Sequence, residues 1–304
     1  MGWKTVLFSI TAVFLVMLLF FYWVFPLETI DFGTVSSRNS NFSLNSYGSD
    51  GVQFYENMRY PSRDISYRIR GCTLKKSDEM EKSFDVIENL TILNFYPATR
   101  NEEISVTCDS KIRFEGDLFV AGEGGPINIT KAGSFNVIQK GAITLIRESK
   151  CENPNVGIHE LLHSLGFDHS ENPNNIMYPV SKCSQTIGED TINLINKIYS
   201  FQSLPDLAFE NVSAMMNGRY LDLNFTIRNQ GLKDSPGGTV EIYADGEIVK
   251  EIESEPLEIG HGSRILLTNI FIFQKNIDEL KFFIKTNFEE LDRENNEAIL
   301  KYKN

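Results

Sequence analysis

The residues best suited to chemistry lie between His159 and His169, in the sequence His-Glu-Leu-Leu-His-Ser-Leu-Gly-Phe-Asp-His. On a helix, His159 and His163 share one face, so both imidazoles can reach one metal ion, and Glu160 lies beside it. Gly166 can adopt the left-handed conformation that ends a helix, and this turn lets His169 return as a third ligand. Three protein ligands leave one position of a tetrahedral zinc ion open for water, which predicts a catalytic rather than a structural site.

A bare H-E-x-x-H also occurs on solvated amphipathic helices that bind no metal, which is the alternative interpretation. The longer pattern favours the metal, because three of the four histidines in the chain fall within eleven residues at ligand spacing. A second signal follows at residues 175–179, Asn-Ile-Met-Tyr-Pro, which has the form of a Met-turn. The fourth histidine, His261, lies between two glycines and is interpreted as an exposed turn residue.

The extended histidine motif followed by a Met-turn resembles the metzincin zinc peptidases. The Met-Tyr-Pro sequence, and the serine after the third histidine, are most similar to the matrixin branch. The resemblance is very specific over residues 156–179 and looser over residues 60–203. It implies an α+β catalytic domain, with a mixed twisted sheet and three helices, that holds one catalytic zinc ion and acts on a protein or peptide substrate.

The same resemblance implies roles for the residues around the Met-turn. Met177 is expected to form an apolar floor below the histidines, and Pro179 and Val180 to shape the pocket for the residue after the scissile bond. Tyr178 follows the methionine directly, whereas families that use a tyrosine as a zinc ligand place it two residues after, so Tyr178 is not expected to bind metal. Asp168 is expected either to support a histidine or to be a solvated carboxylate. The region offers no histidines for a second zinc, and its acidic groups are compatible with calcium without indicating it.

The predicted chemistry is hydrolysis of a peptide bond by zinc-activated water. Zinc lowers the pKa of its bound water to about 7 and polarises the substrate carbonyl. Glu160 is predicted to take a proton from that water as general base and to pass it to the leaving amine. The alternative function is a cell-surface adhesion or binding protein whose metal site is inactive.

The apolar run Val6–Phe25 contains no charged residue over twenty positions. At about 1.5 Å per residue, a helix of this length spans about 30 Å, which is enough to cross a bilayer. The sequence after Phe25, Pro-Leu-Glu, offers no small-x-small cleavage site. We therefore expect an uncleaved signal-anchor over residues 1–27, with Lys4 on the cytoplasmic side and the rest of the chain outside the cell. A buried core helix and cleavage beyond Phe25 are the alternatives.

Residues 28–60 are rich in Ser, Asn, Gly and Asp and are expected to form a stalk or linker. They contain no cysteine, so the sequence does not support the latency through a zinc-bound propeptide cysteine that matrixins often use. An exported chain agrees with five N-x-S/T sequons, which begin at Asn41, Asn89, Asn128, Asn211 and Asn224.

Four cysteines, an even number in an expected exported chain, favour disulfides. Three pairings are possible. The local pairs Cys72–Cys108 and Cys151–Cys183 are favoured, and the second brackets the histidine motif. A cysteine zinc site is the competing hypothesis, but no C-x-x-C spacing supports it.

Alternation and helical spacing predict the elements of the catalytic domain, residues 61–203. Strands are expected at 65–70, 104–107 and 112–120, with one or two more within 135–146. Helices are expected at about 78–93, 156–165 and 190–199. The glycine-rich segment 121–126 is not expected to form regular structure. By resemblance, the edge strand that lines the substrate cleft falls within residues 122–146.

Residues 204–304 show short alternating strands, expected at 220–228, 240–244, 248–252, 264–273, 281–286 and 298–302. About seven strands over this length predict an all-β immunoglobulin-like sandwich. The sequences Pro205-Asp206-Leu207, Arg-Asn-Gln-Gly at 228–231 and Glu-Asn-Asn at 294–296 resemble CARDB domains of microbial surface proteins. That resemblance implies an adhesion or spacer module without catalytic residues.

The net charge of −12 gives no electrostatic basis for nucleic-acid binding, and no such partner is expected. The combined prediction is a membrane-anchored, extracytoplasmic zinc-dependent endopeptidase. Its partners are a protein or peptide substrate and the membrane, while the substrate identity, cleavage preference and oligomeric state stay open.

Overall fold

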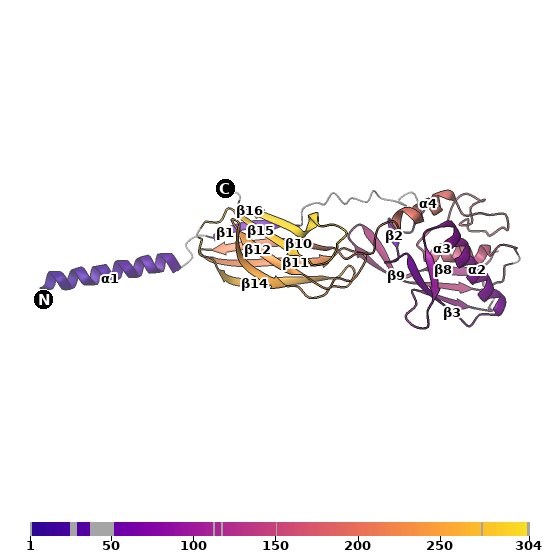
Figure 1. Ribbon diagram of the computed structural model, residues 1–304, viewed down its shortest axis with the longest axis horizontal. Coiled ribbons are helices and arrows are strands. Elements are labelled where there is room, and N and C mark those ends of the chain that lie inside the picture. The colour runs from indigo at the N-terminus through magenta and orange to yellow at the C-terminus, as the bar shows by residue number, and fades with distance from the viewer. Residues whose placement is uncertain are drawn as a thin grey trace. The chain divides into compact units, whose positions relative to one another are not determined.

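The computed structural model describes residues 2–24, 29–36, 52–111, 113–116, 118–149, 151–274 and 276–302 (Figure 1). Phe25, the sequon at Asn41, Ile112 and residues 37–51 of the expected stalk lie outside the described residues. The chain divides into two compact units. The catalytic unit comprises residues 43–205 and 230–233, and the sandwich unit comprises 1–42, 206–229 and 234–304.

Helix α1 (Trp3–Val24) contains the described part of the predicted apolar run, from Val6 to Val24. Its segment Trp3–Phe21 is long and apolar enough to cross a membrane, and it is the one such span among the described residues. None of this segment is buried against the rest of the protein. The fold therefore includes an N-terminal apolar helix that could span a membrane, followed by the expected α+β domain and β domain.

The catalytic unit is built on a mixed sheet with the strand order β2-β9-β5-β3-β4. Neighbouring strands along this path run parallel, and β8 joins the sheet antiparallel to β9. The strands are β2 (Met58–Arg59), β3 (Asp64–Arg70), β4 (Asn94–Pro97), β5 (Ile104–Cys108), β8 (Gly122–Ala132) and β9 (Phe135–Leu145). The helices of this unit are α2 (Leu74–Leu90), α3 (Asn155–Ser164) and α4 (Glu189–Ile198).

Helix α2 packs against the sheet through the apolar stripe that its sequence predicts. Met80, Phe84 and Ile87 are buried in one core with residues of the sheet and of α3. The helix begins at Leu74 rather than near residue 78, because Thr73 caps it: Thr73 Oγ1 accepts a hydrogen bond from the Lys76 amide at 3.4 Å.

The glycine-rich segment 121–126 was expected to be irregular, and this expectation is wrong. It forms the first half of β8, which pairs with β9 from Gly122 to Ala132. A proline is tolerated at Pro126 because β8 lies at the edge of the sheet, where a missing amide donor breaks no inner ladder. The single strand expected at 112–120 is instead a short hairpin of β6 (Phe114–Glu115) and β7 (Leu118–Phe119).

Both disulfides of the catalytic unit join the cysteines that the sequence pairs locally, Cys72 with Cys108 and Cys151 with Cys183. The first links the turn before α2 to the end of β5. The second brackets α3 and the Met-turn, so it closes a covalent loop around the histidine motif.

The sandwich unit consists of two four-stranded antiparallel sheets around one apolar core. The first has the order β1-β10-β11-β14 and the second the order β13-β12-β15-β16. The strands are β1 (Thr29–Val35), β10 (Leu207–Asn217), β11 (Tyr220–Asn229), β12 (Thr239–Ala244), β13 (Glu247–Glu253), β14 (Gly262–Phe271), β15 (Glu279–Lys285) and β16 (Glu297–Lys301). A short 3-10 helix, η1 (Glu294–Asn296), precedes β16.

Strand β1 comes from the segment for which the sequence predicts a stalk. It pairs antiparallel with β10, from Thr29 opposite Asn217 to Val35 opposite Val212, and buries Phe32 in the sandwich core. The catalytic unit is thus inserted, along the chain, between two neighbouring strands of one sheet. No local sequence pattern predicts β1, because its partner strand β10 is almost two hundred residues away along the chain.

Candidate active site

Helix α3 presents the histidine motif from a buried position, since every residue from Asn155 to Ser164 is buried. His159 Nε2 lies 3.0 Å from His163 Nε2, and His163 Nε2 lies 3.2 Å from His169 Nε2. Gly166 has a φ of +94°, the left-handed conformation predicted for the turn that brings His169 back. Among the described residues, these three histidines are the group of His, Cys, Asp or Glu side chains close enough to hold one metal ion.

Backbone carbonyl oxygens fix the orientation of two imidazoles. His159 Nδ1 lies 2.6 Å from the Ile176 carbonyl and His163 Nδ1 lies 2.8 Å from the Phe167 carbonyl. A carbonyl can only accept, so each Nδ1 carries the proton and each Nε2 keeps its lone pair for a metal. Burial lowers the pKa of His159 and lowers that of His163 to about 4, which also keeps both rings neutral.

The Met-turn packs against α3 and is hydrogen-bonded to the segment that follows His169. Met177 is 2% exposed and belongs to the same core as α3. Its amide donates to Asn175 Oδ1 at 2.9 Å, and its carbonyl accepts from the Ser170 amide at 2.9 Å. Because Ile176 supplies the carbonyl that holds His159, the turn is coupled directly to a candidate ligand.

Glu160 is 5% exposed and faces the glycine-rich half of β8. A Cβ atom at Gly122 would lie 2.7 Å from Glu160 Cγ, and one at Gly124 would lie 2.2 Å from the Glu160 carbonyl oxygen. The two glycines therefore allow α3 to approach the edge strand, which explains a composition that looks irregular in the sequence. Burial, with a smaller contribution from the Glu123 carboxylate, raises the pKa of Glu160 to about 8.

A segment before the expected domain boundary also builds the site. Gln53 bridges to Phe167, the Phe54 amide donates to the Gly166 carbonyl at 3.0 Å, and the Asp168 amide donates to the Val52 carbonyl at 3.0 Å. The Phe54 ring stacks on the His163 imidazole with a centroid separation of 5.8 Å. The sequence offers no periodic signal for these contacts, which depend on a turn far along the chain.

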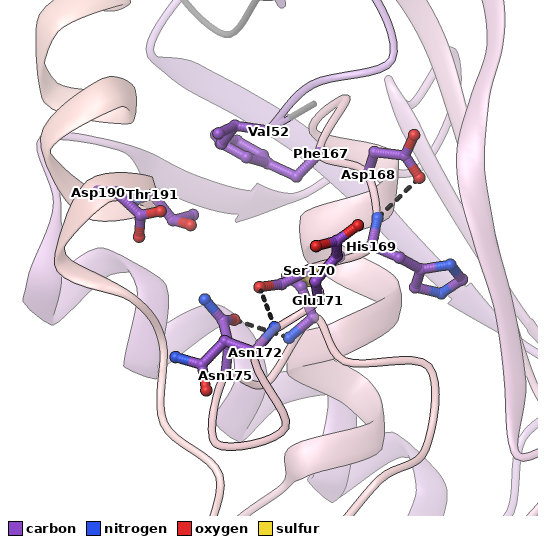
Figure 2. A pocket seen from close by; sticks show the side chains of 11 residues that line it. Val52, Phe167, Asp168, His169, Ser170, Glu171, Asn172, Asn175, Asp190 and Thr191 are labelled. Carbon is purple, nitrogen blue, oxygen red and sulfur yellow. Dashed lines mark hydrogen bonds between the residues drawn. The ribbon is translucent and has the colours of Figure 1, made fainter. Parts of the chain in front are cut away.

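A pocket lies beside His169, and whether it is the substrate pocket predicted for Pro179 and Val180 is not tested by its lining. That pocket, of about 470 Å³, is lined by Asn172, Asn175 and Asp190 among others, and in Figure 2 the His169 imidazole turns away from them. Pro179 and Val180 are exposed and do not line it. Asp168 Oδ1 accepts from the His169 amide at 2.7 Å, so this carboxylate supports the backbone of the third histidine.

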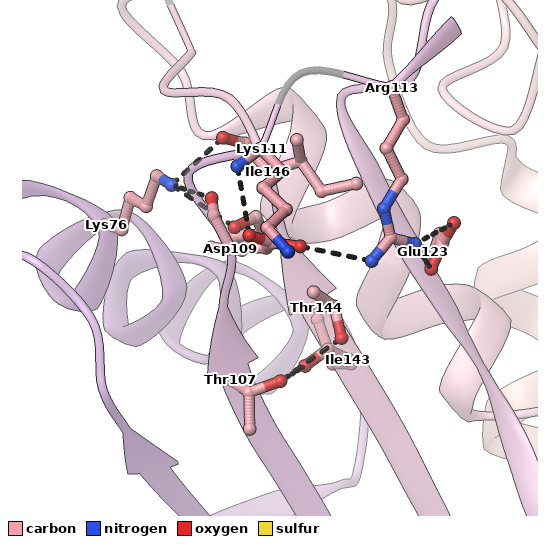
Figure 3. Close-up of polar contacts among 10 residues, drawn as sticks. Lys76, Thr107, Asp109, Lys111, Arg113, Glu123, Ile143, Thr144 and Ile146 are labelled. Atoms are coloured by element: carbon pink, nitrogen blue, oxygen red, sulfur yellow. Dashed lines mark hydrogen bonds and ion pairs between the residues drawn. The ribbon is translucent and has the colours of Figure 1, made fainter.

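A chain of ion pairs connects the start of β8 to the turn after β5 (Figure 3). Arg113 Nη1 lies 2.8 Å from Glu123 Oε2, and Arg113 Nη2 lies 3.1 Å from Asp109 Oδ2. The chain joins the edge strand to the turn after β5. These side chains are exposed or partly exposed, so solvent screens the two pairs and their contribution to stability is small.

A buried lysine of α2 is hydrogen-bonded to the ends of strands β5 and β9. Lys76 of α2 is 7% exposed, and its ammonium group donates to three backbone carbonyls at 2.8, 3.3 and 2.9 Å (Figure 3). The acceptors are Asp109, Leu145 and Ile146, so Lys76 connects α2 to the ends of β5 and β9.

Comparisons with known proteins agree with this architecture. Residues 59–200 match the family model described as Matrixin, and residues 204–299 match the one described as CARDB. The chain therefore contains a matrixin-like domain followed by a CARDB domain, which confirms the resemblance predicted from the sequence. The matrixin match and the histidine group support a zinc metalloprotease. A comparison with curated protein sequences finds no significant match.

Three of the similar solved structures are a CARDB domain, myroilysin and a hatching enzyme zinc-protease. The CARDB domain of a Pyrococcus furiosus protein, in complex with di-metal ions, is 17% identical, with 33% of this chain and 87% of that chain covered and a TM-score of 0.29. Myroilysin is 14% identical, with coverages of 36% and 52% and a TM-score of 0.25. High choriolytic enzyme 1, a hatching enzyme zinc-protease from the medaka Oryzias latipes, is 17% identical, with coverages of 42% and 54% and a TM-score of 0.23.

Proposed function

We propose that this protein is a membrane-anchored, extracytoplasmic zinc-dependent endopeptidase. The observation that carries the proposal is the convergence of three Nε2 atoms beside a buried glutamate that faces an edge strand. His159, His163 and His169 are the proposed zinc ligands, because the first two have Nδ1 hydrogen-bonded to carbonyls and Nε2 free for a metal.

Glu160 is the proposed general base, because the charge of a bound zinc ion would favour its carboxylate form against the burial that raises its pKa. When bound, the zinc ion supplies a Lewis acid and lowers the pKa of water to about 7. Glu160 accepts a proton from the attacking water and delivers it to the amide nitrogen as the carbon–nitrogen bond breaks, so the products are a free carboxylate and an amine. Met177 holds the loop that carries His159's carbonyl partner and takes no part in proton transfer.

Strand β8 is the proposed platform for the substrate backbone. Among the described residues β8 pairs only with β9, so its outer edge can accept an extended peptide as an additional strand. The close approach of α3 to Gly122 and Gly124 places Glu160 next to that edge. Pro179 and Val180, which are exposed after the Met-turn, are proposed to contact the residue after the scissile bond.

The proposed location follows from the apolar helix and the disulfides. α1 could anchor the chain, and two disulfides in the catalytic unit suit an oxidising compartment outside the cytoplasm. We propose the organisation of anchor (1–27), linker (28–60), catalytic domain (61–203) and sandwich (204–304), to which the structure adds β1 in the sandwich and residues 52–60 in the catalytic unit.

Cleavage of unfolded casein by the zinc-loaded full chain in detergent tests the proposal, with products identified by mass spectrometry. Internal cleavage that a zinc chelator abolishes and that Glu160→Gln lowers by about a thousandfold is expected. Glu152→Gln, which changes an exposed glutamate eight residues earlier, is the matched control and should retain activity. Equal cleavage by the wild type and Glu160→Gln would favour the adhesion alternative.

A further inference from the structure

The sandwich unit contains a second buried polar cluster, at the point where the chain enters β10. Asp206 is 4% exposed, and its Oδ1 accepts a hydrogen bond from Asn295 Nδ2 at 2.9 Å. Glu290 is 9% exposed and accepts from the Leu207 amide at 3.0 Å and from Asn296 Nδ2 at 2.7 Å. The cluster thus joins the start of β10 to the loop before β16 through acidic and amide side chains.

Acceptor oxygens in this cluster outnumber the donors. Asp292 Oδ2, Asn295 Oδ1 and Asn296 Oδ1 are buried and have no hydrogen-bond partner. Asn295 is 6% exposed and Asn296 is 3% exposed. The side-chain nitrogen of Asn295 donates to Asp206 and that of Asn296 donates to Glu290, while both side-chain oxygens are left without a donor. A buried acceptor without a partner is unfavourable by about 1–3 kcal/mol, so three in one loop would be stabilised by a bound positive group.

None of the ion pairs between described residues includes Asp206, Glu290 or Asp292. Burial is the main cause that raises the pKa of Asp206 to about 7, and the Glu290 and Asp292 carboxylates raise it further. The Asp206 carboxylate therefore experiences two like charges, and it forms no ion pair with a described residue.

We propose that this cluster is a calcium site, in which the Asp206 and Asp292 carboxylates and the side-chain carbonyls of Asn295 and Asn296 bind the ion. The donor set is all oxygen, which suits a hard cation such as calcium and not the zinc that the three imidazoles favour. Both oxygens of Glu290 already accept hydrogen bonds, from Leu207 and from the side chains of Thr286 and Asn296, so this carboxylate holds the loop in place. Bound calcium would link the start of β10 to the loop that precedes β16.

Calcium titration of the full chain in detergent, with zinc saturated and the buffer freed of calcium, tests the proposal by calorimetry. One saturable site with a dissociation constant of about 0.1–1 mM is expected, as in extracellular calcium modules. Asp292→Asn should weaken binding about tenfold or more, since it removes one charged ligand. The control Glu247→Gln changes an exposed carboxylate of the same unit and should bind as the wild type.

Hydrogen exchange distinguishes this site from calcium bound elsewhere. Calcium should slow amide exchange in residues 288–296 of the wild type and of Glu160→Gln, but not of Asp292→Asn. Because Glu160→Gln lacks the proposed catalytic base, slowed exchange in this variant separates the calcium site from peptidase function. The absence of saturable binding up to about 10 mM calcium, or binding that Asp292→Asn leaves unchanged, overturns the proposal.

Discussion

The two buried polar regions of this protein differ in the balance of hydrogen-bond donors and acceptors. In the catalytic unit, the buried donors of Lys76, His159 and His163 are met by backbone carbonyls, and the free Nε2 atoms all point to one place. In the sandwich unit, buried oxygens of Asp292, Asn295 and Asn296 have no donor. The first region presents nitrogen ligands that its own chain has oriented for the proposed zinc ion, whereas the second presents unpartnered oxygens, which suit the proposed calcium ion.

Of the substitutions that test this comparison, Gly124→Ala is expected to have the largest effect, which is on peptidase activity. Gly124→Ala puts a Cβ atom 2.2 Å from the Glu160 carbonyl oxygen, so α3 must move away from β8 and the histidine cluster with it. We expect casein cleavage to fall by at least about a hundredfold, because displacements near 1 Å are enough for such losses. The matched control is Gly125→Ala, since a Cβ at Gly125 meets nothing within 4 Å. Equal activity of the two variants would contradict the role of the close approach.

The next effect is expected from Lys76→Met. Loss of the ammonium group leaves three buried backbone carbonyls without this donor, which should lower the free energy of unfolding by about 2–4 kcal/mol in chemical denaturation. Lys75→Met removes the neighbouring, exposed lysine and its surface pair with Glu148, and should change stability far less than Lys76→Met does. Similar losses in the two variants would show that donor matching in the catalytic unit is unimportant.

A smaller effect is expected from Phe54→Ala, which removes the ring stacked on His163. The ring contact is worth about 0.5–1.5 kcal/mol, so zinc should dissociate about two- to tenfold more readily in competition with a chelating dye. Tyr55→Ala, at a 59% exposed neighbour, is the control and should leave zinc affinity unchanged. An unaltered zinc affinity in Phe54→Ala would assign this segment to folding alone.

The smallest effect is expected in the sandwich unit without calcium. Asp292→Asn replaces an oxygen that lacks a partner by an amide and removes a charge that acts on Asp206, so stability should rise by up to about 1 kcal/mol in calcium-free buffer. In saturating calcium the order should reverse, because the wild type gains binding energy that the variant loses. A loss of stability that is the same with and without calcium would contradict the contrast between the two regions.

The sequence predicts what is close along the chain. His159, His163 and His169 form a candidate site because they lie on one helix and its turn, and the local cysteine pairs are observed for the same reason. Alternation also predicts strands such as β11 and β15, because each of them buries one face.

Features that depend on distant partners were missed or misassigned. Strand β1 pairs with β10, and Asn295 meets Asp206 across 89 positions, so no local pattern reveals either contact. The glycines at 122 and 124 were interpreted as loop residues, although they allow a helix to approach a strand. Their composition is informative only once α3 is known to pack there.

Zinc K-edge X-ray absorption of the zinc-loaded chain tests the central claim most directly. One zinc ion per chain is expected, with three imidazole ligands in the wild type and in Glu160→Gln, and with one imidazole fewer in His169→Ala. A chain that retains no zinc, or a spectrum without imidazole scattering that is unchanged in His169→Ala, would contradict the proposed site and the peptidase function that rests on it.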